Sequence, residues 1–236
     1  MPRAVICLPT FNERENLERM IEALEPLDVD VLVIDDNSPD GTGDIADRLA
    51  AERTWLSVLH RERKEGLGRA YIAGFREVLR GDADYILEMD CDFSHDPSDV
   101  PRLIAAVEGG ADLALGSRYV AGGGTENWGL VRRLLSRGAS IYTRVLLMPI
   151  HDSTGGFKCF RRRVLESIEL ETIDAAGYVF QIETTYRTLR RRFRVVEVPI
   201  RFADRTAGQS KMSRAIVLEA IWKVPVLRLR ALLGRL

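Results

Sequence analysis

Residues 85–97 read YILEMDCDFSHDP, an apolar run that ends abruptly in two carboxylates, Asp90 and Asp92. The run Tyr85–Met89 has the length and composition of a buried strand. Two aspartates at a strand end can hold one hard cation and leave coordination positions for phosphate oxygens and water. Alternatively, they only solvate a turn, which aspartate favours. Cys91 is not expected to be a metal ligand, because it points away from its neighbours in an extended chain and thiolate suits hard cations poorly.

Strand and helix patterns alternate on both sides of this stretch. Further strands are predicted at 4–8, 29–34, 57–61 and 111–116, with helical patterns between them. Strands that alternate with helices predict right-handed crossovers and a mostly parallel sheet, the α/β class. In open sheets of this kind, ligands bind beyond the carboxyl ends of the strands. One cleft is therefore expected to contain the three segments that directly follow strands, 9–13, 35–37 and 90–92.

Charge is distributed unevenly along the 236 residues. Residues 1–116 contain 25 acidic and 12 basic side chains, and residues 117–236 contain 10 acidic and 22 basic ones, so the net charges are −13 and +12. A basic half predicts contact with something anionic, namely phosphates, nucleic acid or a membrane surface. Nucleic acid is disfavoured, because few aromatic residues interleave with the bases and no recognition motif is present.

Two basic segments of the second half are predicted to be helical. Residues 127–148, which follow Glu126, contain no acidic side chain. Residues 214–236 have an apolar side that includes Ile221, Val224 and Leu227. Both segments could lie in a membrane interface or pack against the rest of the chain. No stretch approaches the length of about 18 apolar residues that a membrane-spanning helix needs, and no signal peptide is expected. The three well-separated cysteines fit a reducing compartment.

Seven segments occur in order along the chain: LPTFNERENL, VLVIDDNSPDGT, GLGRAYIAGF, MDCDFSHDP, GSRYVAGGGTENW, STGGFKCFRR and RTAGQSKMS. Together they resemble the family-2 glycosyltransferases of the GT-A fold, and most closely the dolichol-phosphate (polyprenol-phosphate) mannosyltransferases. The resemblance covers about residues 4–213. It implies a Rossmann-like, mostly parallel sheet flanked by helices, with a GT-A catalytic domain over 1–213 and a C-terminal amphipathic segment, 214–236, at a membrane interface.

The resemblance implies a donor site for GDP-mannose in the expected cleft. The residues that it assigns to the nucleotide sugar are Pro9, Phe11, Glu13, Ile34, Asp36, Asp90, Cys91, Asp92, Arg205 and Lys211. Asp90 and Asp92, with Ser94 as an auxiliary ligand, would hold Mg²⁺ or Mn²⁺ on the donor diphosphate. His95 has no assigned chemistry, because one histidine after a turn is more often structural.

The acceptor implied by the resemblance is a polyprenyl (dolichyl-type) monophosphate, bound by Arg118, Arg132 and Ser136. A guanidinium fork matches a phosphate geometrically. The residues assigned to the transfer itself are Asp92, Arg118 and Arg205. A phosphate monoester is already ionised at neutral pH, so no general base is assigned. The expected reaction is a single displacement with inversion that yields a β-linked lipid phosphomannose.

Other functions remain open or are disfavoured. A lipid-phosphate glucosyl- or N-acetylglucosaminyltransferase that uses a UDP-sugar would share the fold and the paired aspartates. A sugar-phosphate nucleotidyltransferase is disfavoured, because its glycine-rich basic loop is missing at residues 8–13. The expected location is peripheral, at the cytoplasmic face of a membrane, with attachment through the tail or through a separate membrane-anchoring protein.

Overall fold

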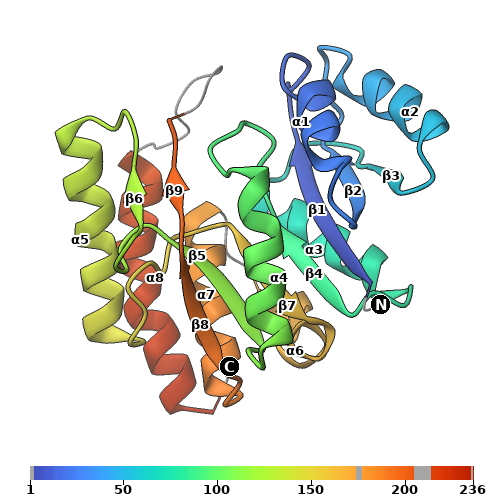
Figure 1. The fold of residues 1–236 in the computed structure, drawn as a ribbon. Helices are drawn as coiled ribbons and strands as arrows, with labels where there is room; N and C mark the ends of the chain where they lie inside the picture. The colour runs from blue at the N-terminus through green and yellow to red at the C-terminus, as the bar shows by residue number, and fades with distance from the viewer. Residues whose placement is uncertain (1–2, 174–176, 205–213, 235) are drawn as a thin grey trace.

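The computed structural model describes residues 3–173, 177–204, 214–234 and 236, with side chains for all of these except 214–220 (Figure 1). The strands are β1 (Ala4–Thr10), β2 (Asp30–Asp35), β3 (Leu56–His60), β4 (Tyr85–Glu88), β5 (Leu113–Ser117), β6 (Gly124–Thr125), β7 (Lys158–Arg161), β8 (Val195–Pro199) and β9 (Arg201–Phe202). The helices are α1 (Leu17–Leu24), α2 (Thr42–Glu52), α3 (Leu67–Leu79), α4 (Val100–Glu108), α5 (Leu130–Leu146), α6 (Arg162–Ser167), α7 (Gly177–Arg190) and α8 (Arg214–Leu232). Two short 3₁₀ turns, η1 (Pro97–Asp99) and η2 (Leu170–Thr172), complete the chain order.

The main sheet has seven strands in the order β3-β2-β1-β4-β7-β5-β8. Only β7 runs antiparallel to its neighbours in this sheet, and the remaining pairs are parallel. The mostly parallel α/β sheet predicted from the alternating pattern is therefore confirmed. A separate two-stranded ribbon pairs β6 with β9.

Hydrophobic cores cover both faces of this sheet. Alternate residues of β1 divide between them, because side chains of a strand point to opposite faces in turn. Ile6 and Leu8 contact the core closed by α1, α2 and α4, whereas Val5 and Cys7 contact the core closed by α3, α6 and α7. In Figure 1, α4 lies in front of the sheet and α3 behind it. Burial on both faces explains why these strands have almost no polar residues until they end.

The strand register brings the predicted loops to one edge. Pro9 pairs with Ile34 and Thr10 with Asp35, so the loops after β1 and β2 start side by side. On the other flank of β1, Cys7 pairs with Glu88, two residues before Asp90. The three segments expected to share a cleft therefore follow adjacent strands at the carboxyl edge.

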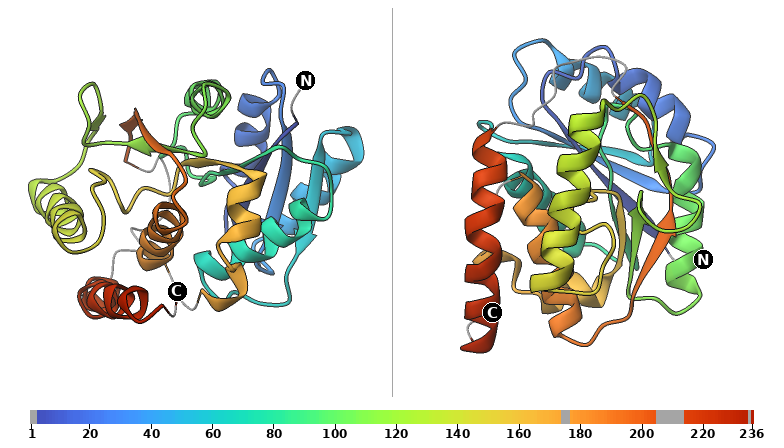
Figure 2. Two further views of the ribbon diagram at one scale, coloured as in Figure 1. Left: turned by 90° about the horizontal axis from the view of Figure 1, so that it is seen from below. Right: turned by 90° about the vertical axis from the view of Figure 1, so that its left-hand side faces the viewer.

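The C-terminal half adds a third group of helices beside the sheet. Helices α5 and α8 run side by side on one face of the molecule (Figure 2), and α8 also contacts α7. The apolar side predicted for residues 214–236 is not one surface: Val224 and Leu227 are buried, whereas Ile221 is 53% exposed. Residues 195–202 contain two short strands, β8 and β9, that belong to different sheets. Within the described residues, no helix combines the length and the apolar character needed to cross a bilayer.

Candidate active site

The loop after β4 holds the two predicted metal-binding aspartates in fixed positions. The Tyr71 hydroxyl donates to Asp90 Oδ1 at 3.3 Å. Asp92 is buried, and its Oδ1 accepts from both the backbone N–H and the hydroxyl of Ser94, at 3.1 and 2.5 Å. Ser94, predicted as an auxiliary metal ligand, thus donates its hydroxyl hydrogen to Asp92. This bond orients the carboxylate.

His95 also shapes this loop, although the sequence assigned it no chemistry. Its Nδ1 accepts from the backbone N–H of Asp90 at 3.1 Å, which places the ring proton on Nε2. The buried ring stacks on Phe157, with centroids 4.8 Å apart, and meets the edge of Phe202 at 5.2 Å. These contacts give the histidine a structural role: it fixes the backbone N–H of Asp90 and packs against two aromatic rings. Its position three residues after Asp92 was the only sequence signal of this role.

The carboxylates of this loop can supply part of the coordination sphere of a hard divalent cation. Among the described residues, no cluster of three or more His, Cys, Asp or Glu side chains could hold a metal by itself. Two carboxylates therefore provide two ligand groups, and a bound diphosphate and water would have to complete the sphere. Burial raises the pKa of the Cys91 thiol, and the carboxylates of Glu13, Asp92 and Asp90 reinforce the effect. Cys91 packs in the core, so any contact it makes with a donor must come from its backbone.

The ends of β1, β2 and β3 form the expected nucleotide side of the site. Asp36 is buried and accepts a hydrogen bond from the Arg61 guanidinium. Burial raises the pKa of Asp36, and the charge of Arg61 opposes this shift. Arg61 was not among the predicted residues; it directly follows β3, and that position was the available signal. The pair presents both a carboxylate and guanidinium donors at the sheet edge.

The other predicted donor residues of this side lie within or shortly after β1 and β2. Phe11 is half-buried, and Lys64 Nζ lies 3.9 Å from the centroid of its ring. Glu13 Oε2 accepts from the side-chain amide of Asn16 at 2.8 Å. Pro9 is half-buried, while Ile34 packs in the core. Arg205 and Lys211 lie outside the described residues.

Arg118, at the end of β5, is held by an extensive set of contacts. Asp152 Oδ2 accepts from its backbone N–H and from Nε at 2.8 and 2.7 Å, and Asp152 Oδ1 accepts from Nη2 at 2.6 Å. Nη2 also donates to Thr154 at 2.8 Å. Burial alone would lower the pKa of Arg118, but the Asp152 carboxylate outweighs it and raises the pKa, so the guanidinium stays charged. The remaining nitrogen of the Arg118 guanidinium, Nη1, takes no part in these hydrogen bonds to Asp152 and Thr154.

Arg132 and Ser136, both on α5, lie on the same side of the site as Arg118. The guanidinium of Arg132 stacks over the Trp128 ring at 4.0 Å, and the Arg118 guanidinium lies 5.4 Å from the same ring. Ser136 accepts from the Tyr119 hydroxyl at 2.7 Å. Two of the three residues predicted for the lipid phosphate, Arg118 and Arg132, thus meet at the ring of Trp128, a residue that no sequence pattern singled out.

A cavity of about 350 Å³ opens beside these residues. Arg118 and Ser136 line it together with mostly apolar side chains from α5, α7 and α8, including Leu135, Ile182 and Ile221. Within the described residues, two buried N–H donors near the cavity have no acceptor: Nε1 of Trp128, which lines it, and Nε of Arg132, which stacks on Trp128. Unpaired buried donors are costly. The cavity therefore suits an anionic head group joined to an apolar tail.

A paired-aspartate loop and an arginine cluster at the carboxyl edge of a mostly parallel sheet define a glycosyltransferase of the GT-A class. The solved structures that this chain resembles have the same fold. Glucosyl-3-phosphoglycerate synthase from Mycobacterium tuberculosis, in complex with UDP, matches with a TM-score of 0.70 and 21% identity over 96% of this chain and 80% of that one. The mannosyltransferase PcManGT from Pyrobaculum calidifontis, in complex with GDP-Man and Mn²⁺, matches with a TM-score of 0.62 and 14% identity over 99% and 74%.

The chain belongs to glycosyl transferase family 2, whose family model matches residues 5–169. It is 48% identical to polyprenol monophosphomannose synthase of Mycolicibacterium smegmatis, over 99% of this chain and 89% of that protein. It is 47% identical to undecaprenyl-phosphate mannosyltransferase of Micrococcus luteus, over 94% and 92%. Dolichol-phosphate mannosyltransferase of Pyrococcus furiosus is 38% identical over 91% of this chain and 60% of its own length.

Proposed function

We propose that this protein transfers mannose from GDP-mannose to a polyprenyl (dolichyl-type) monophosphate. The observation that carries the proposal is the cavity that combines Arg118 and Ser136 with apolar walls, because it matches a phosphate on a hydrocarbon chain. The names of the three relatives support mannose as the sugar and a polyprenyl phosphate as the acceptor. The GDP-Man complex of the structural neighbour supports the donor.

The acceptor phosphate needs orientation more than activation. A phosphate monoester carries most of its charge at neutral pH, so its oxygen can attack the sugar C1 without a general base. The protein must instead hold two anionic reactants together against their repulsion. Among the described residues, Nε of Arg132 and Nε1 of Trp128 have no acceptor, and Nη1 of Arg118 is not used in the bonds to Asp152 and Thr154, so these three donors are proposed for the acceptor phosphate. Attack from this side inverts the anomeric centre and gives a β-linked lipid phosphomannose.

The donor diphosphate is assigned to the loop after β4. Asp90 and Asp92 would hold Mg²⁺ or Mn²⁺, which when bound supplies positive charge against the diphosphate. The hydroxyl of Ser94 keeps the Asp92 carboxylate oriented for this task. Asp36 can accept from guanine or ribose donors, with Arg61 beside it. Arg205 and Lys211, outside the described residues, are proposed to meet the diphosphate and sugar phosphate.

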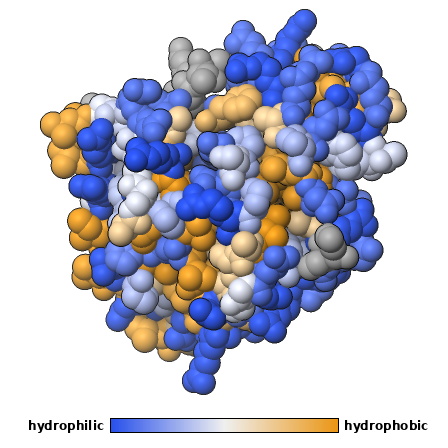
Figure 3. All heavy atoms as spheres, in the orientation of Figure 1, coloured by the Kyte–Doolittle hydropathy of each residue, from blue (hydrophilic) through white to orange (hydrophobic). Residues whose placement is uncertain are grey.

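We also propose that the protein attaches peripherally to the cytoplasmic face of a membrane. Among the described residues, every exposed large apolar side chain lies on α5 or on α8 and the residue after it: Leu130, Val131, Leu134, Leu135, Ile141, Val145, Ile221, Trp222, Leu229, Leu232 and Leu233. Figure 3 shows apolar side chains along the left edge of the molecule, over α5. Apolar side chains with flanking arginines are typical of interfacial helices. The three free, buried cysteines agree with the cytoplasmic side.

A donor and acceptor screen tests the function. The purified protein is incubated with polyprenyl phosphate, Mg²⁺ or Mn²⁺, and labelled GDP-mannose, UDP-glucose or UDP-N-acetylglucosamine, with unphosphorylated polyprenol as the matched acceptor control. Transfer is expected only from GDP-mannose and only to the phosphate, and the product's anomeric coupling should be that of a β-linkage. Turnover with a UDP-sugar alone would instead establish the alternative glucosyl- or N-acetylglucosaminyltransferase.

A further inference from the structure

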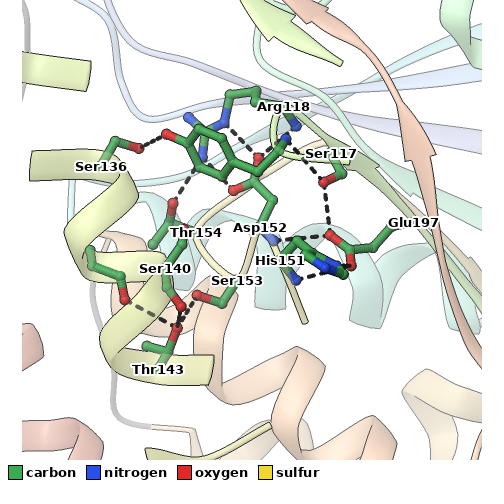
Figure 4. A network of polar contacts seen from close by, with 12 residues as sticks. Ser117, Arg118, Ser136, Ser140, Thr143, His151, Asp152, Ser153, Thr154 and Glu197 are labelled. Carbon is green, nitrogen blue, oxygen red and sulfur yellow. Dashed lines mark hydrogen bonds and ion pairs between the residues drawn. The ribbon is translucent and has the colours of Figure 1, made fainter. Parts of the chain in front are cut away.

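The Glu197 carboxylate, on β8, binds the backbone that carries Asp152. Its Oε1 accepts from the Ser117 hydroxyl at 2.7 Å and from the Asp152 N–H at 2.9 Å. Its Oε2 accepts from the backbone N–H and from Nδ1 of His151, at 2.9 and 2.8 Å. A carboxylate only accepts, so the His151 contact uses the Nδ1–H form of the ring. Figure 4 shows these four bonds converging on Glu197.

The next step of the network runs from Asp152 to Arg118. The Asp152 carboxylate accepts three hydrogen bonds from Arg118, and both side chains are almost completely buried, at 0% and 5% exposure. The turn that follows Asp152 is also closely packed, because a Cβ on Gly155 would lie 3.0 Å from the carbonyl oxygen of Gly116. The carboxylate of Glu197 thus fixes the 151–152 backbone, and the carboxylate of Asp152 fixes the guanidinium.

We propose that Glu197 is a positioning residue for mannose transfer, which acts through Asp152 to aim Nη1 of Arg118 at the acceptor phosphate. The inference rests on the acceptor role proposed for Arg118. A free arginine side chain loses rotamer entropy when it binds a phosphate, and a preorganised guanidinium does not lose that entropy again. Charge-assisted hydrogen bonds of this length are strong enough to hold it.

Glutamine cannot substitute for Glu197, although it has the same shape. Each carboxylate oxygen accepts from one backbone N–H, of Asp152 on Oε1 and of His151 on Oε2. In either orientation of the amide, its NH₂ group would face one of these N–H donors. One donor would lose its acceptor, and the 151–152 turn would be expected to shift. Glu197→Gln therefore tests the hydrogen bonds with little change in volume.

The test measures acceptor and donor constants separately. Glu197→Gln is expected to raise the KM for polyprenyl phosphate about tenfold, as for loss of one charge-assisted hydrogen bond, and to leave the KM for GDP-mannose unchanged. The matched control is Glu183→Gln, since Glu183 is a buried glutamate on α7 whose carboxylate accepts from Arg187 at 2.9 and 2.6 Å. The control should lower the melting temperature without changing either KM.

A double-mutant cycle decides whether Glu197 acts through Arg118. Acceptor affinity is measured by titrating a short isoprenyl phosphate into each protein. In the Arg118→Ala background, Glu197→Gln should have no further effect on that affinity. If Glu197→Gln does not fold, Ser117→Ala is the second variant, since it removes one of the four hydrogen bonds that Glu197 accepts. It should also raise the KM for the acceptor, by a smaller factor.

The outcomes separate the inference from the proposed function. Additive effects in the cycle, or an unchanged acceptor KM in Glu197→Gln, would overturn the positioning role while leaving Arg118 as an acceptor ligand. If Arg118→Ala alters only the donor constants, the acceptor assignment itself is wrong and the inference fails with it.

Discussion

Nη1 of Arg132 donates to the carboxylate of Asp204 across 2.6 Å, which joins α5 to the residue shortly after β9. Both side chains are partly exposed, Arg132 at 21% and Asp204 at 42%. Asp204 therefore occupies one donor of the guanidinium whose Nε is proposed to meet the acceptor phosphate. Acceptor binding would have to replace this carboxylate or share the guanidinium with it.

Removing the competing charge should strengthen acceptor binding. Asp204→Asn is expected to lower the KM for polyprenyl phosphate two- to fivefold, since a partly exposed ion pair is worth about 0.2–1 kcal/mol. Steady-state kinetics with varied acceptor measure this. Glu126→Gln is the matched control, because Glu126 pairs with Arg201 at 3.6 Å beside the same ribbon. A higher acceptor KM in Asp204→Asn would contradict the competition, and an unchanged one would show that the pair is not displaced.

Arg132 itself should matter for the acceptor more than for the donor. Arg132→Ala removes the guanidinium stacked on Trp128 and is expected to raise the polyprenyl phosphate KM by about tenfold or more, as for loss of a charged hydrogen bond. The affinity for GDP-mannose, measured by calorimetry, should change little. An effect confined to the donor would reverse the assignment of the two sides of the site.

The metal assignment predicts a specific loss at Asp92. Asp92→Asn should reduce transfer by about a hundredfold or more, because an amide cannot neutralise a cation that faces a diphosphate. Ser94→Ala, which removes the donor 2.5 Å from Asp92 Oδ1, should raise the Mn²⁺ concentration needed for half-maximal rate. Asp96→Asn is the control, since Asp96 only caps η1 through the Ser98 N–H and asparagine can also cap. Full activity of the wild type after chelation and dialysis would refute the ion site.

A buried charge pair under the site should make stability depend on pH. Lys158 Nζ lies 3.9 Å from Glu88 Oε2, and both side chains are completely buried. Burial raises the pKa of Glu88 to about 7 and lowers the pKa of Lys158 to about 8. A carboxyl whose pKa is raised on folding contributes stability at low pH that is lost as the pH rises, here from its usual 4.5 to about 7.

Lys158→Met removes the positive charge that partners Glu88. The stability lost as the pH rises should therefore be larger in this variant. The variant is expected to be less stable by about 3–5 kcal/mol near neutral pH, with a smaller deficit at pH 5, where Glu88 is protonated. Urea unfolding at pH 5 and pH 8 measures both values. Adding Glu88→Gln should recover part of the stability at pH 8. Equal deficits at the two pH values would argue that Lys158 acts only through its bonds to Gln181 and Thr184.

The exposed face of α5 should bind membranes. Val131→Ser, Ile141→Ser and Val145→Ser together remove three side chains that do not line the cavity. Flotation with anionic vesicles is expected to fall at least about tenfold, because each apolar side chain contributes through its buried area. Turnover of a short, water-soluble isoprenyl phosphate should be kept. Loss of both vesicle binding and turnover would indicate damage to the fold. If vesicle binding and turnover are both kept, α5 is excluded as the attachment surface.

Local patterns were enough to predict the sheet and the edge at which the loops after β1, β2 and β4 lie. Apolar runs such as Val29–Ile34 alternate with helical periodicity, and parallel strands then place their following loops at one edge. The paired aspartates and Asp36 were placed at this edge for this reason, whereas Arg118 and Arg132 were assigned through the resemblance to family-2 glycosyltransferases. The grouping of Ile221 with Val224 and Leu227 failed, because which side of α8 is buried depends on α7 and not on the helix alone.

The sequence by itself determined the α/β class, the order of the loops around the site and the residue types that are proposed to meet a diphosphate and a lipid phosphate. Only the tertiary structure decided which partners those residues have. Asp152 with Arg118, Glu197 with Ser117 and Asp204 with Arg132 are separated by 34, 80 and 72 positions. Hydrogen bonds between such distant residues form only when strands and helices pack in three dimensions, so no local periodicity or motif encodes them.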